Sequence, residues 1–361
     1  MLSHLTLTEL GWTDRFQSIY NSVDNTGCIP GRLATEHRGG FVAFTTAGEL
    51  FCEVAGRLRF DASDRGDLPA VGDWVVLRPR PTSGSGGDQA QIIRILDRKT
   101  KFSRKVVGTA TEEQVLAANI DYLFVVSSLT EEFNVRRIER YLTNAWDGGV
   151  TPVVVLTKAD LSDDPGGAVS DVEAVAPLVD VVVTSVVTSR GIDEVANYMR
   201  DHQTVALVGS SGVGKSSLIN LLLGEHVLKV SETRSDDRGR HTTTHRELLV
   251  LPTGGLIIDT PGMRELQLWG TEDALDESFQ EIALLAADCR FNDCAHDSEP
   301  GCAVIEALDS GILDRARFQS YLKLGREIAA LDRRVDQRAA LAEKKKWKAV
   351  TKSFRLRNTK E

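Results

Sequence analysis

The sequence predicts a multidomain protein with a small N-terminal β-barrel, a central α/β domain built on a mostly parallel sheet, and a helical C-terminal region. Three observations support this prediction. Short β-like runs, separated by glycine-containing turns, fill residues 31–98. Apolar, strand-length runs then alternate with helical patterns as far as about residue 275, and a glycine-rich phosphate-loop motif lies among them. Near the C-terminus, three cysteines and one histidine fall within 14 residues.

The composition is that of a folded protein with two or three domains. Of its 361 residues, 42% are apolar and 26% are charged, which excludes a disordered chain, a collagen and a coiled-coil rod. No run approaches the ~18 apolar residues of a transmembrane helix, and the first residues lack the basic and apolar segments of a secretory signal. We therefore expect a cytoplasmic monomer with no membrane partner.

The charge is distributed unevenly along the chain. The net charge of -9 argues against a general nucleic-acid binder, but residues 333–361 hold 11 Lys and Arg against 3 Asp and Glu. The rest of the chain holds 32 basic and 49 acidic residues. An acidic body with a basic tail favours a local contact with a polyanion.

Residues 31–105 are predicted to form the barrel, and residues 1–30, which are weakly patterned, a mobile N-terminal arm. The expected strands lie in GRLATEH, GFVAFTT, ELFCEVAGRLRF, DWVVLRP and AQIIRIL. Five short strands favour an OB-fold, although an SH3-like barrel would give a similar pattern. A barrel that only packs on its neighbour is the alternative to a binding role. The stretch TSGSGGD, residues 82–88, is expected to be a flexible loop.

Residues 112–275 are predicted to form the α/β domain. Its expected strands lie in DYLFVVSSL, TPVVVLTKADL, VDVVVTSVV, TVALVGSS and GGLIIDTPG, and NVRRIERYLTNAWDGG is expected to be helical. Strands rich in β-branched residues that alternate with helices indicate a mostly parallel sheet covered on both faces. Residues 276–361 are expected to be a helical, metal-binding domain with a basic tail.

A phosphate loop is the strongest motif in the chain. Gly209-Ser-Ser-Gly-Val-Gly214-Lys215-Ser216 matches G-x4-G-K-[S/T] at every position, between a predicted strand and a predicted helix. Its backbone N–H groups would surround the β-phosphate beside the positive helix N-terminus. We expect Lys215 to bridge the β- and γ-phosphates. The nucleotide-binding residues predicted in this loop are Gly209, Ser210, Ser211, Gly212, Val213, Gly214, Lys215, Ser216 and Ser217.

Three side chains are predicted to bind Mg²⁺ with the nucleotide. The Ser216 hydroxyl is one, and Asp259, which ends the strand LIID, is suited to hold the ion through water. The polar segment at 238–244 is long enough to be a switch loop, and Thr243 is our choice among its threonines. Gly262 offers an N–H to the γ-phosphate.

The sequence Thr157-Lys158-Ala159-Asp160 follows a predicted strand and resembles the guanine-reading N-K-x-D motif of the GTPase superfamily. The Asp160 carboxylate would accept from the guanine N1–H and N2–H₂, and the Lys158 stem would lie along the ring. Thr157 in place of Asn removes an amide from the base pocket and softens selectivity. Ser185 resembles the loop that covers guanine O6, with Val186 in place of Ala.

These base-reading motifs precede the phosphate loop, whereas they follow it in an ordinary GTPase. Because the termini of compact domains often lie close together, the same sheet can be built with its chain ends moved. The order therefore predicts a circularly permuted GTPase domain. In Ras-type enzymes a Gln follows the D-T-P-G-like segment to orient water, but here that residue is Met263. We expect His241 to hold the attacking water instead, with a merely structural role in the loop as the alternative.

The cluster Cys289-x4-Cys294-x-His296-x5-Cys302 offers three thiolates and one imidazole. Four soft ligands with no open position fit a structural, tetrahedral Zn²⁺. The alternative is buried cysteines beside a surface histidine. Further on, EKKKWKAVTKSFRLRNTK mixes cations with Trp347 and Phe354, which is typical of RNA contact, although a basic run is often only a solvated surface.

Nearly the whole chain resembles the family of ribosome small-subunit-dependent GTPases (RsgA). The resemblance rests on PAVGDWV, NVRRIERYL, TKADL, GSSGVGKSSLIN, GRHTTTHREL, DTPGMRE and the cysteine cluster, in that order. It implies an OB-fold, a permuted GTPase domain and a zinc-binding domain. It also implies binding to the small ribosomal subunit and its rRNA near the decoding region during late maturation, with hydrolysis of GTP to GDP when docked. The switch histidine of the family corresponds to His241.

Two further hypotheses about the function remain at this point. One is a nucleotide-gated, RNA-binding placeholder whose hydrolysis is incidental. The other is an ATP-dependent P-loop protein, which Asp160 disfavours because adenine lacks the donor pair that a carboxylate reads.

Overall fold

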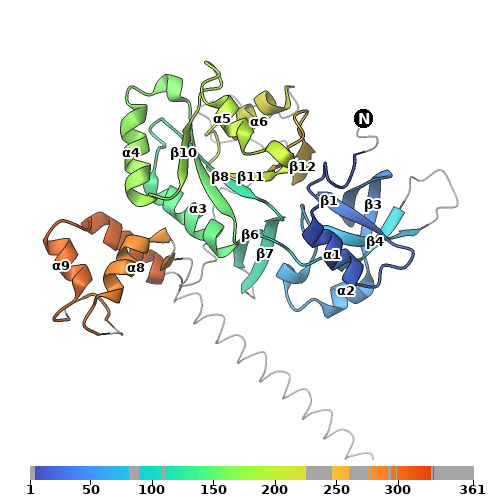
Figure 1. The fold of residues 1–361 in the computed structure, drawn as a ribbon, viewed down its shortest axis with the longest axis horizontal. Helices are drawn as coiled ribbons and strands as arrows, with labels where there is room; N and C mark the ends of the chain where they lie inside the picture. The colour runs from blue at the N-terminus through green and yellow to red at the C-terminus, as the bar shows by residue number, and fades with distance from the viewer. Residues whose placement is uncertain are drawn as a thin grey trace, which may run out of the picture. The chain divides into compact units, whose positions relative to one another are not determined.

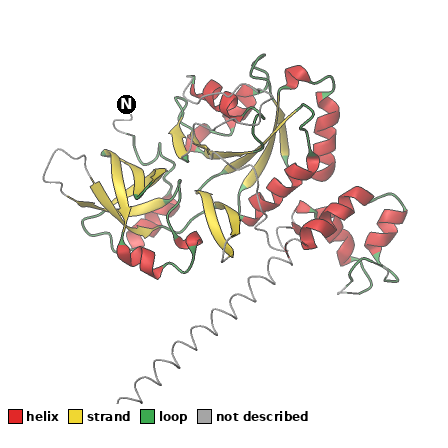
Figure 2. Ribbon diagram, turned by 180° about the vertical axis from the view of Figure 1, so that it is seen from behind, coloured by secondary structure: helices red, strands yellow, loops and turns green. Residues whose placement is uncertain are grey.

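The computed structural model describes residues 5–80, 89–107, 111–224, 246–259, 275–276, 278–291, 294–297, 299–326 and 328. The chain separates into two compact units, one formed by residues 1–104 with 113–267 and the other by residues 105–112 with 268–361. The first unit contains both the barrel and the α/β domain (Figure 1), and the second contains the cysteine cluster. Most of the strands belong to the first unit, whereas the second unit is helical (Figure 2). The predicted domain boundaries stay predictions.

Five strands of the first unit close into a barrel. They are β1 (Ile29–His37), β2 (Gly40–Thr45), β3 (Gly48–Val54), β4 (Trp74–Arg80) and β5 (Gln89–Ile95). Their order is β1-β2-β3-β5-β4, and β4 pairs again with β1 to close the ring. The pair β3–β5 is parallel and the others are antiparallel. The predicted five-stranded barrel of the OB type is confirmed.

One predicted strand of the barrel is too long. The third run was expected to extend through GRLRF, but the strand ends at Val54 and a short helix, α2 (Gly56–Asp61), follows. Burial accounts for the end of the strand. Inward-facing residues alternate along β3, as a strand on a barrel core requires, whereas α2 has no buried residue. A 3₁₀ turn, η1 (Arg65–Asp67), then leads toward β4. Residues 82–88, the expected flexible loop, lie outside the described residues.

The N-terminal segment packs on the barrel, so the expectation of a mobile arm is corrected. Leu10 is completely buried, and helix α1 (Asp14–Ser22) buries Phe16. The Trp12 ring meets Trp74 of β4 edge-to-face, with the ring centroids 4.6 Å apart. Sequence pattern alone misses this contact because α1 is short and its apolar partners lie some 60 residues further along the chain.

The α/β domain has a six-stranded sheet in the order β10-β9-β8-β11-β13-β12. These strands are β8 (Tyr122–Ser128), β9 (Thr151–Thr157), β10 (Asp180–Val183), β11 (Thr204–Val208), β12 (Glu247–Val250) and β13 (Leu256–Asp259). All neighbours run parallel except β12, which pairs antiparallel with β13. The mostly parallel sheet is confirmed, and β12 is an additional, antiparallel strand that lies outside the runs predicted to form strands.

Helices cover both faces of this sheet. Successive residues of each strand alternate between two apolar clusters, as a pleated sheet requires. One cluster joins α3 (Val135–Asp147) and α4 (Pro165–Val175) to the sheet, and the other joins α5 (Ile192–Asn197) and α6 (Lys215–Leu223) to the opposite face. The 3₁₀ turn η3 (Arg200–His202) precedes β11. Among the described helices, none combines the length and the hydropathy needed to cross a bilayer.

The barrel and the α/β domain belong to the same compact unit, and they also share one sheet. Strand β1 pairs with β12 at Thr35 and Glu247, which makes one continuous 11-stranded sheet. Beside this pair, the Arg246 guanidinium lies 3.1 Å from the Glu36 carboxylate. The hairpin β6 (Lys101–Val107) and β7 (Thr111–Ala118) connects the two domains along the chain.

Arg32 is buried at this junction, with 1% of its surface exposed. Its guanidinium donates to the backbone carbonyls of Leu10, Gly72 and Asn119, which belong to the N-terminal segment, the barrel and the connection to β8. Burial lowers the pKa of Arg32 to about 10. The Arg32 guanidinium can be buried because backbone carbonyl oxygens accept hydrogen bonds from its N–H groups.

The second unit is small and helical. It contains α8 (Gln280–Ala287), α9 (Ala303–Asp309) and further helical residues at 315–326. Among the residues described in this unit, ten buried side chains form its core, including Phe279, Ile282 and Cys302. The predicted helical character of this region is confirmed for the described residues.

Candidate nucleotide site and metal centre

The phosphate loop lies between β11 and α6, as its motif predicts. Gly209, Gly212 and Gly214 have φ values of 144°, 81° and 100°, which L side chains rarely adopt. The Lys215 ammonium donates to the carbonyls of Gly209 and Ser210, both at 2.7 Å. The ammonium group is therefore held against the loop at the N-terminus of α6, where positive charge and free N–H groups favour a phosphate.

Gly209→Ala is expected to disturb this loop severely. A Cβ at this position would lie 2.2 Å from the Val126 carbonyl oxygen, so the loop or β8 would have to move. We expect the affinity for nucleotide to fall at least ~10-fold and the melting temperature to drop by several degrees. Gly224→Ala is the matched control, because Gly224 also has a positive φ, at the other end of α6, but nothing lies within 4 Å of its added Cβ. Equal losses in both variants would show that backbone strain, and not the clash, is responsible.

The predicted base-reading residues come together at the end of β9. The Ser185 hydroxyl donates to the Asp160 carboxylate at 2.5 Å, and the Ala159 N–H donates to the Thr184 carbonyl at 3.1 Å. Lys158 has a left-handed backbone, with φ of 58°, just before the 3₁₀ turn η2 (Ala159–Leu161). The loop that follows β10 thus holds Asp160 in place from outside its own strand.

Thr157 makes a contact that the motif alone does not predict. It is buried, and its hydroxyl donates to the Val213 carbonyl of the phosphate loop at 2.5 Å. The residue therefore links the end of β9 to the phosphate loop. The sequence gives no signal for this bond, because 56 residues separate the two partners.

Two of the three candidate magnesium residues, Ser216 and Asp259, lie at the same edge of the sheet. Strands β11 and β13 are parallel, with Ala206 opposite Ile258, so Asp259 ends its strand beside the start of the phosphate loop. Ser216 lies in the first turn of α6. His241, Thr243 and Gly262 lie outside the described residues.

One contact at the phosphate loop was missed by the sequence interpretation. Arg137, in the first turn of α3, donates to the Ser210 hydroxyl at 2.5 Å. Asn134 begins this helix by accepting from the Arg137 N–H. The segment NVRRIERYL is predicted to be helical and is one of the motifs of the family resemblance, but neither a helical period nor a charge pattern shows which loop the arginine will meet.

Cys289, Cys294, His296 and Cys302 converge in the second unit, with one ligand atom of each within 4.8 Å of the others. The Cys289 and Cys302 sulfurs are 3.8 Å apart, and His296 Nδ1 lies 3.6 Å and 3.4 Å from them. Tetrahedral Zn²⁺ with Zn–S bonds of ~2.3 Å places two sulfurs ~3.8 Å apart, so the cluster fits. Partial burial lowers the pKa of His296, which favours the neutral imidazole that binds a metal. The cluster could therefore hold a metal ion.

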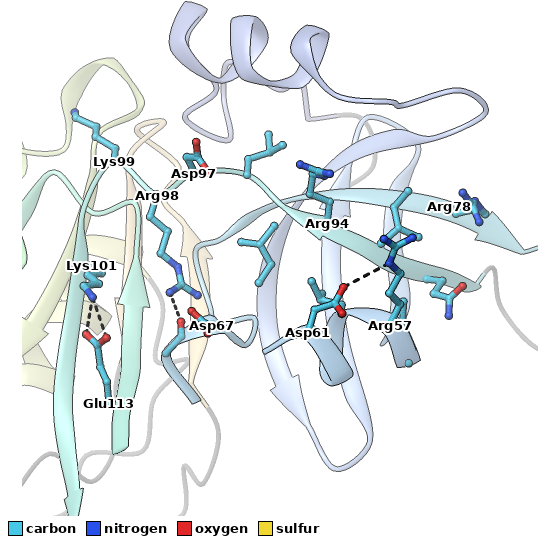
Figure 3. Close-up of a pocket in the computed structure, with 18 of the residues that line it drawn as sticks. Arg57, Asp61, Asp67, Arg78, Arg94, Asp97, Arg98, Lys99, Lys101 and Glu113 are labelled. Carbon is cyan, nitrogen blue, oxygen red and sulfur yellow. Dashed lines mark hydrogen bonds and ion pairs between the residues drawn. The ribbon is translucent and has the colours of Figure 1, made fainter. Parts of the chain in front are cut away.

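A separate groove of about 1120 Å³ lies where the barrel meets the β6–β7 hairpin (Figure 3). Some of its charges are paired, since Lys101 contacts Glu113 at 2.8 Å and the exposed Arg57 contacts Asp61 at 3.5 Å. Arg78 and Arg94 also line it and are exposed. The groove is polar and open, unlike an enclosed cofactor pocket, and lies on the barrel side of the unit.

The strand order, the phosphate loop and the base-reading loops together define a class of protein. In chain order β8, β9 and β10 come first, and the predicted base-reading residues follow β9 and β10. These strands nevertheless form the half of the sheet next to β11, which leads into the phosphate loop. Such a sheet belongs to a circularly permuted P-loop GTPase.

Comparison with known proteins agrees with this class. The family model described as RsgA GTPase matches residues 95–269. A curated relative from Opitutus terrae, "Small ribosomal subunit biogenesis GTPase RsgA", is 47% identical over 359 residues, which are 98% of each chain. "Small ribosomal subunit biogenesis GTPase RsgA 2" from Lactiplantibacillus plantarum is also 47% identical, over 90% of each chain.

Solved structures show the same fold. YjeQ from Thermotoga maritima matches with a TM-score of 0.61 and 27% identity over 84% of this chain and 99% of that one. YloQ, described as a circularly permuted GTPase, matches with a TM-score of 0.57 and 23% identity over 85% and 97% of the two chains. The chain belongs to the RsgA family of GTPases, and it is a GTP hydrolase.

Proposed function

We propose that this chain binds the small ribosomal subunit during the subunit's biogenesis and hydrolyses GTP to GDP and phosphate when docked on it. The observation that supports this most strongly is the 47% identity, over 98% of both chains, to a GTPase named for small-subunit biogenesis. The convergence of base-reading and phosphate-binding residues at one sheet edge supports the nucleotide part independently. The proposed place of action is the cytoplasm.

Guanine recognition is assigned to the ends of β9 and β10. Asp160 accepts from the guanine N1–H and N2–H₂, and Ser185 fixes one of its oxygens. The Lys158 stem and Ala159 line the base. The phosphate loop binds the β-phosphate through its N–H groups, and Lys215 bridges the β- and γ-phosphates.

Ser216, Asp259 and Thr243 would hold Mg²⁺, and Gly262 would donate its N–H to the γ-phosphate. Bound Mg²⁺ supplies charge neutralisation for the leaving and transferred phosphates. His241 orients the attacking water, because the thioether of Met263 cannot accept or donate a strong hydrogen bond.

The metal of the second unit is proposed to be one structural Zn²⁺, held by Cys289, Cys294, His296 and Cys302. Contact with rRNA is assigned to the barrel and to the basic residues 333–361. The exposed Arg57, Arg78 and Arg94 along the groove support a phosphate-binding role for the barrel (Figure 3).

The decisive experiment compares GTP turnover with and without purified small subunits. We expect stimulation of at least ~10²-fold, since partners of GTPases accelerate hydrolysis by up to ~10⁵-fold. Large subunits serve as the control. His241→Ala should keep its affinity for GTP but lose about 10²-fold or more of the stimulated rate, and it should stay trapped on subunits.

The placeholder hypothesis gives a different result in the same assay. If hydrolysis is incidental, subunits will not change turnover, and His241→Ala will leave the subunits as readily as the unmodified chain. Unchanged turnover of His241→Ala together with clear stimulation of the unmodified chain would remove only the catalytic assignment.

A further inference from the structure

Thr157 occupies the position at which the N-K-x-D motif carries asparagine, and its hydroxyl has a defined partner. Only 2% of its surface is exposed. The hydroxyl lies 2.5 Å from the Val213 carbonyl and 3.3 Å from the Ser127 carbonyl. Both acceptors belong to the backbone, one in the phosphate loop and one in β8. Whichever of the two carbonyls accepts the hydrogen bond, the Thr157 O–H group points into the protein.

The contact joins the two halves of the nucleotide site. Val213 is buried and directly precedes Gly214, whose backbone lies against Thr157, since a Cβ built there would be 3.6 Å from the threonine hydroxyl. Strand β9, which leads into Asp160, is thereby connected to the start of α6. Thr157 is a positioning residue for the phosphate loop.

This use of the hydroxyl has a consequence for the base. Guanine presents an acceptor at N7, and an acceptor can be read only by a donor. An asparagine amide has two N–H donors, so it can hold a carbonyl with one and reach N7 with the other. Threonine has a single O–H, and here the Val213 carbonyl accepts it.

We propose that this site reads guanine through the Asp160–Ser185 pair and leaves N7 unread. The inference rests on the proposed binding of guanine nucleotides. Because no donor reads N7 in this proposal, the chain should tolerate purines altered at position 7. It should remain selective at N1 and N2, which Asp160 reads. The substrate class is thus guanine nucleotides, with or without an acceptor at position 7.

The test is a comparison of dissociation constants for GDP and 7-deaza-GDP, in which a C–H replaces N7. We expect the two values to agree within about 2-fold for the unmodified chain. Inosine diphosphate, which lacks the N2 amine, should bind at least several-fold more weakly because Asp160 loses a partner. Weaker binding of 7-deaza-GDP by about 5-fold or more would show that N7 is read and would overturn the proposal.

Three substitutions separate the positioning role from base reading. Thr157→Asn restores the amide and should introduce a preference of about 2- to 13-fold for GDP over 7-deaza-GDP, the effect of one hydrogen bond. Thr157→Val should weaken both ligands equally, and Thr157→Ser should restore both. Thr143→Val is the matched control, because Thr143 is also fully buried with its hydroxyl on a backbone carbonyl, that of Glu139, but it lies in α3.

The outcomes also separate this inference from the proposed function. A chain that binds ADP as tightly as GDP would contradict guanine recognition as a whole. A chain that prefers GDP to ADP and also rejects 7-deaza-GDP would contradict only the statement about N7. The result for the unmodified chain decides the matter even if Thr157→Asn fails to fold.

Discussion

Lys215→Ala is expected to lower the affinity for GTP by about 10²- to 10⁴-fold, and the affinity for GDP, which lacks the γ-phosphate, by less. The side chain provides charge-assisted hydrogen bonds to two phosphates, each worth ~1.5–3 kcal/mol. In this structure the ammonium is already fixed by the Gly209 and Ser210 carbonyls at 2.7 Å, so little conformational entropy is lost when a phosphate binds. Titration with a fluorescent guanine nucleotide measures the loss.

A nucleotide without a β-phosphate provides the internal control. Lys215→Ala should leave the weak binding of GMP unchanged, because the base-reading pair is intact and the β-phosphate site is not used. Lys323→Ala, which removes an exposed lysine of the second unit, should leave the GTP affinity within about 2-fold. An equal loss for GMP and GTP would contradict the assignment and indicate that the loop has collapsed.

Removal of the metal is expected to unfold the second unit while the nucleotide site stays intact. Helices α8 and α9 have 8 and 7 residues, too few to be stable alone in water. Cys302 both belongs to the metal cluster and accepts from the Ile305 N–H at the start of α9. Structural Zn²⁺ sites supply ~10–16 kcal/mol of apparent binding free energy at neutral pH, and that energy is lost on chelation.

Elemental analysis should give one zinc per chain, and hydrogen exchange of residues 280–309 should rise strongly after chelation. The same exchange is expected for Cys302→Ser without chelator. Cys28→Ser is the matched control, because Cys28 lies in the first unit and contacts the Thr26 carbonyl. Protection of residues 280–309 that survives complete loss of metal would exclude a structural role.

Much of this architecture could be predicted from sequence because it rests on local patterns. The phosphate loop needs glycines at positions that the structure gives positive φ, and Gly209, Gly212 and Gly214 supply them. The parallel strands are runs of β-branched residues, which are typical of strands buried on both faces. The permuted order followed from the positions of two motifs along the chain. The cysteine cluster could be found because its four candidate ligands lie within 14 residues.

The remaining features depend on partners that are distant in the sequence. The packing of Leu10 and Trp12 requires Trp74, and the role of Thr157 requires Val213. The bond from Arg137 to Ser210 joins residues 73 positions apart. Such contacts are set by how the elements meet in space, so no local period encodes them.

The buried Arg32 and the pairing of β1 with β12 bear on modularity. A domain that can be exchanged between proteins presents a polar surface where it is cut. Here the cut would uncover the edge of β12 and leave the Asn119 carbonyl without the Arg32 guanidinium. We therefore expect the barrel and the GTPase domain to be retained together when domains are exchanged between proteins.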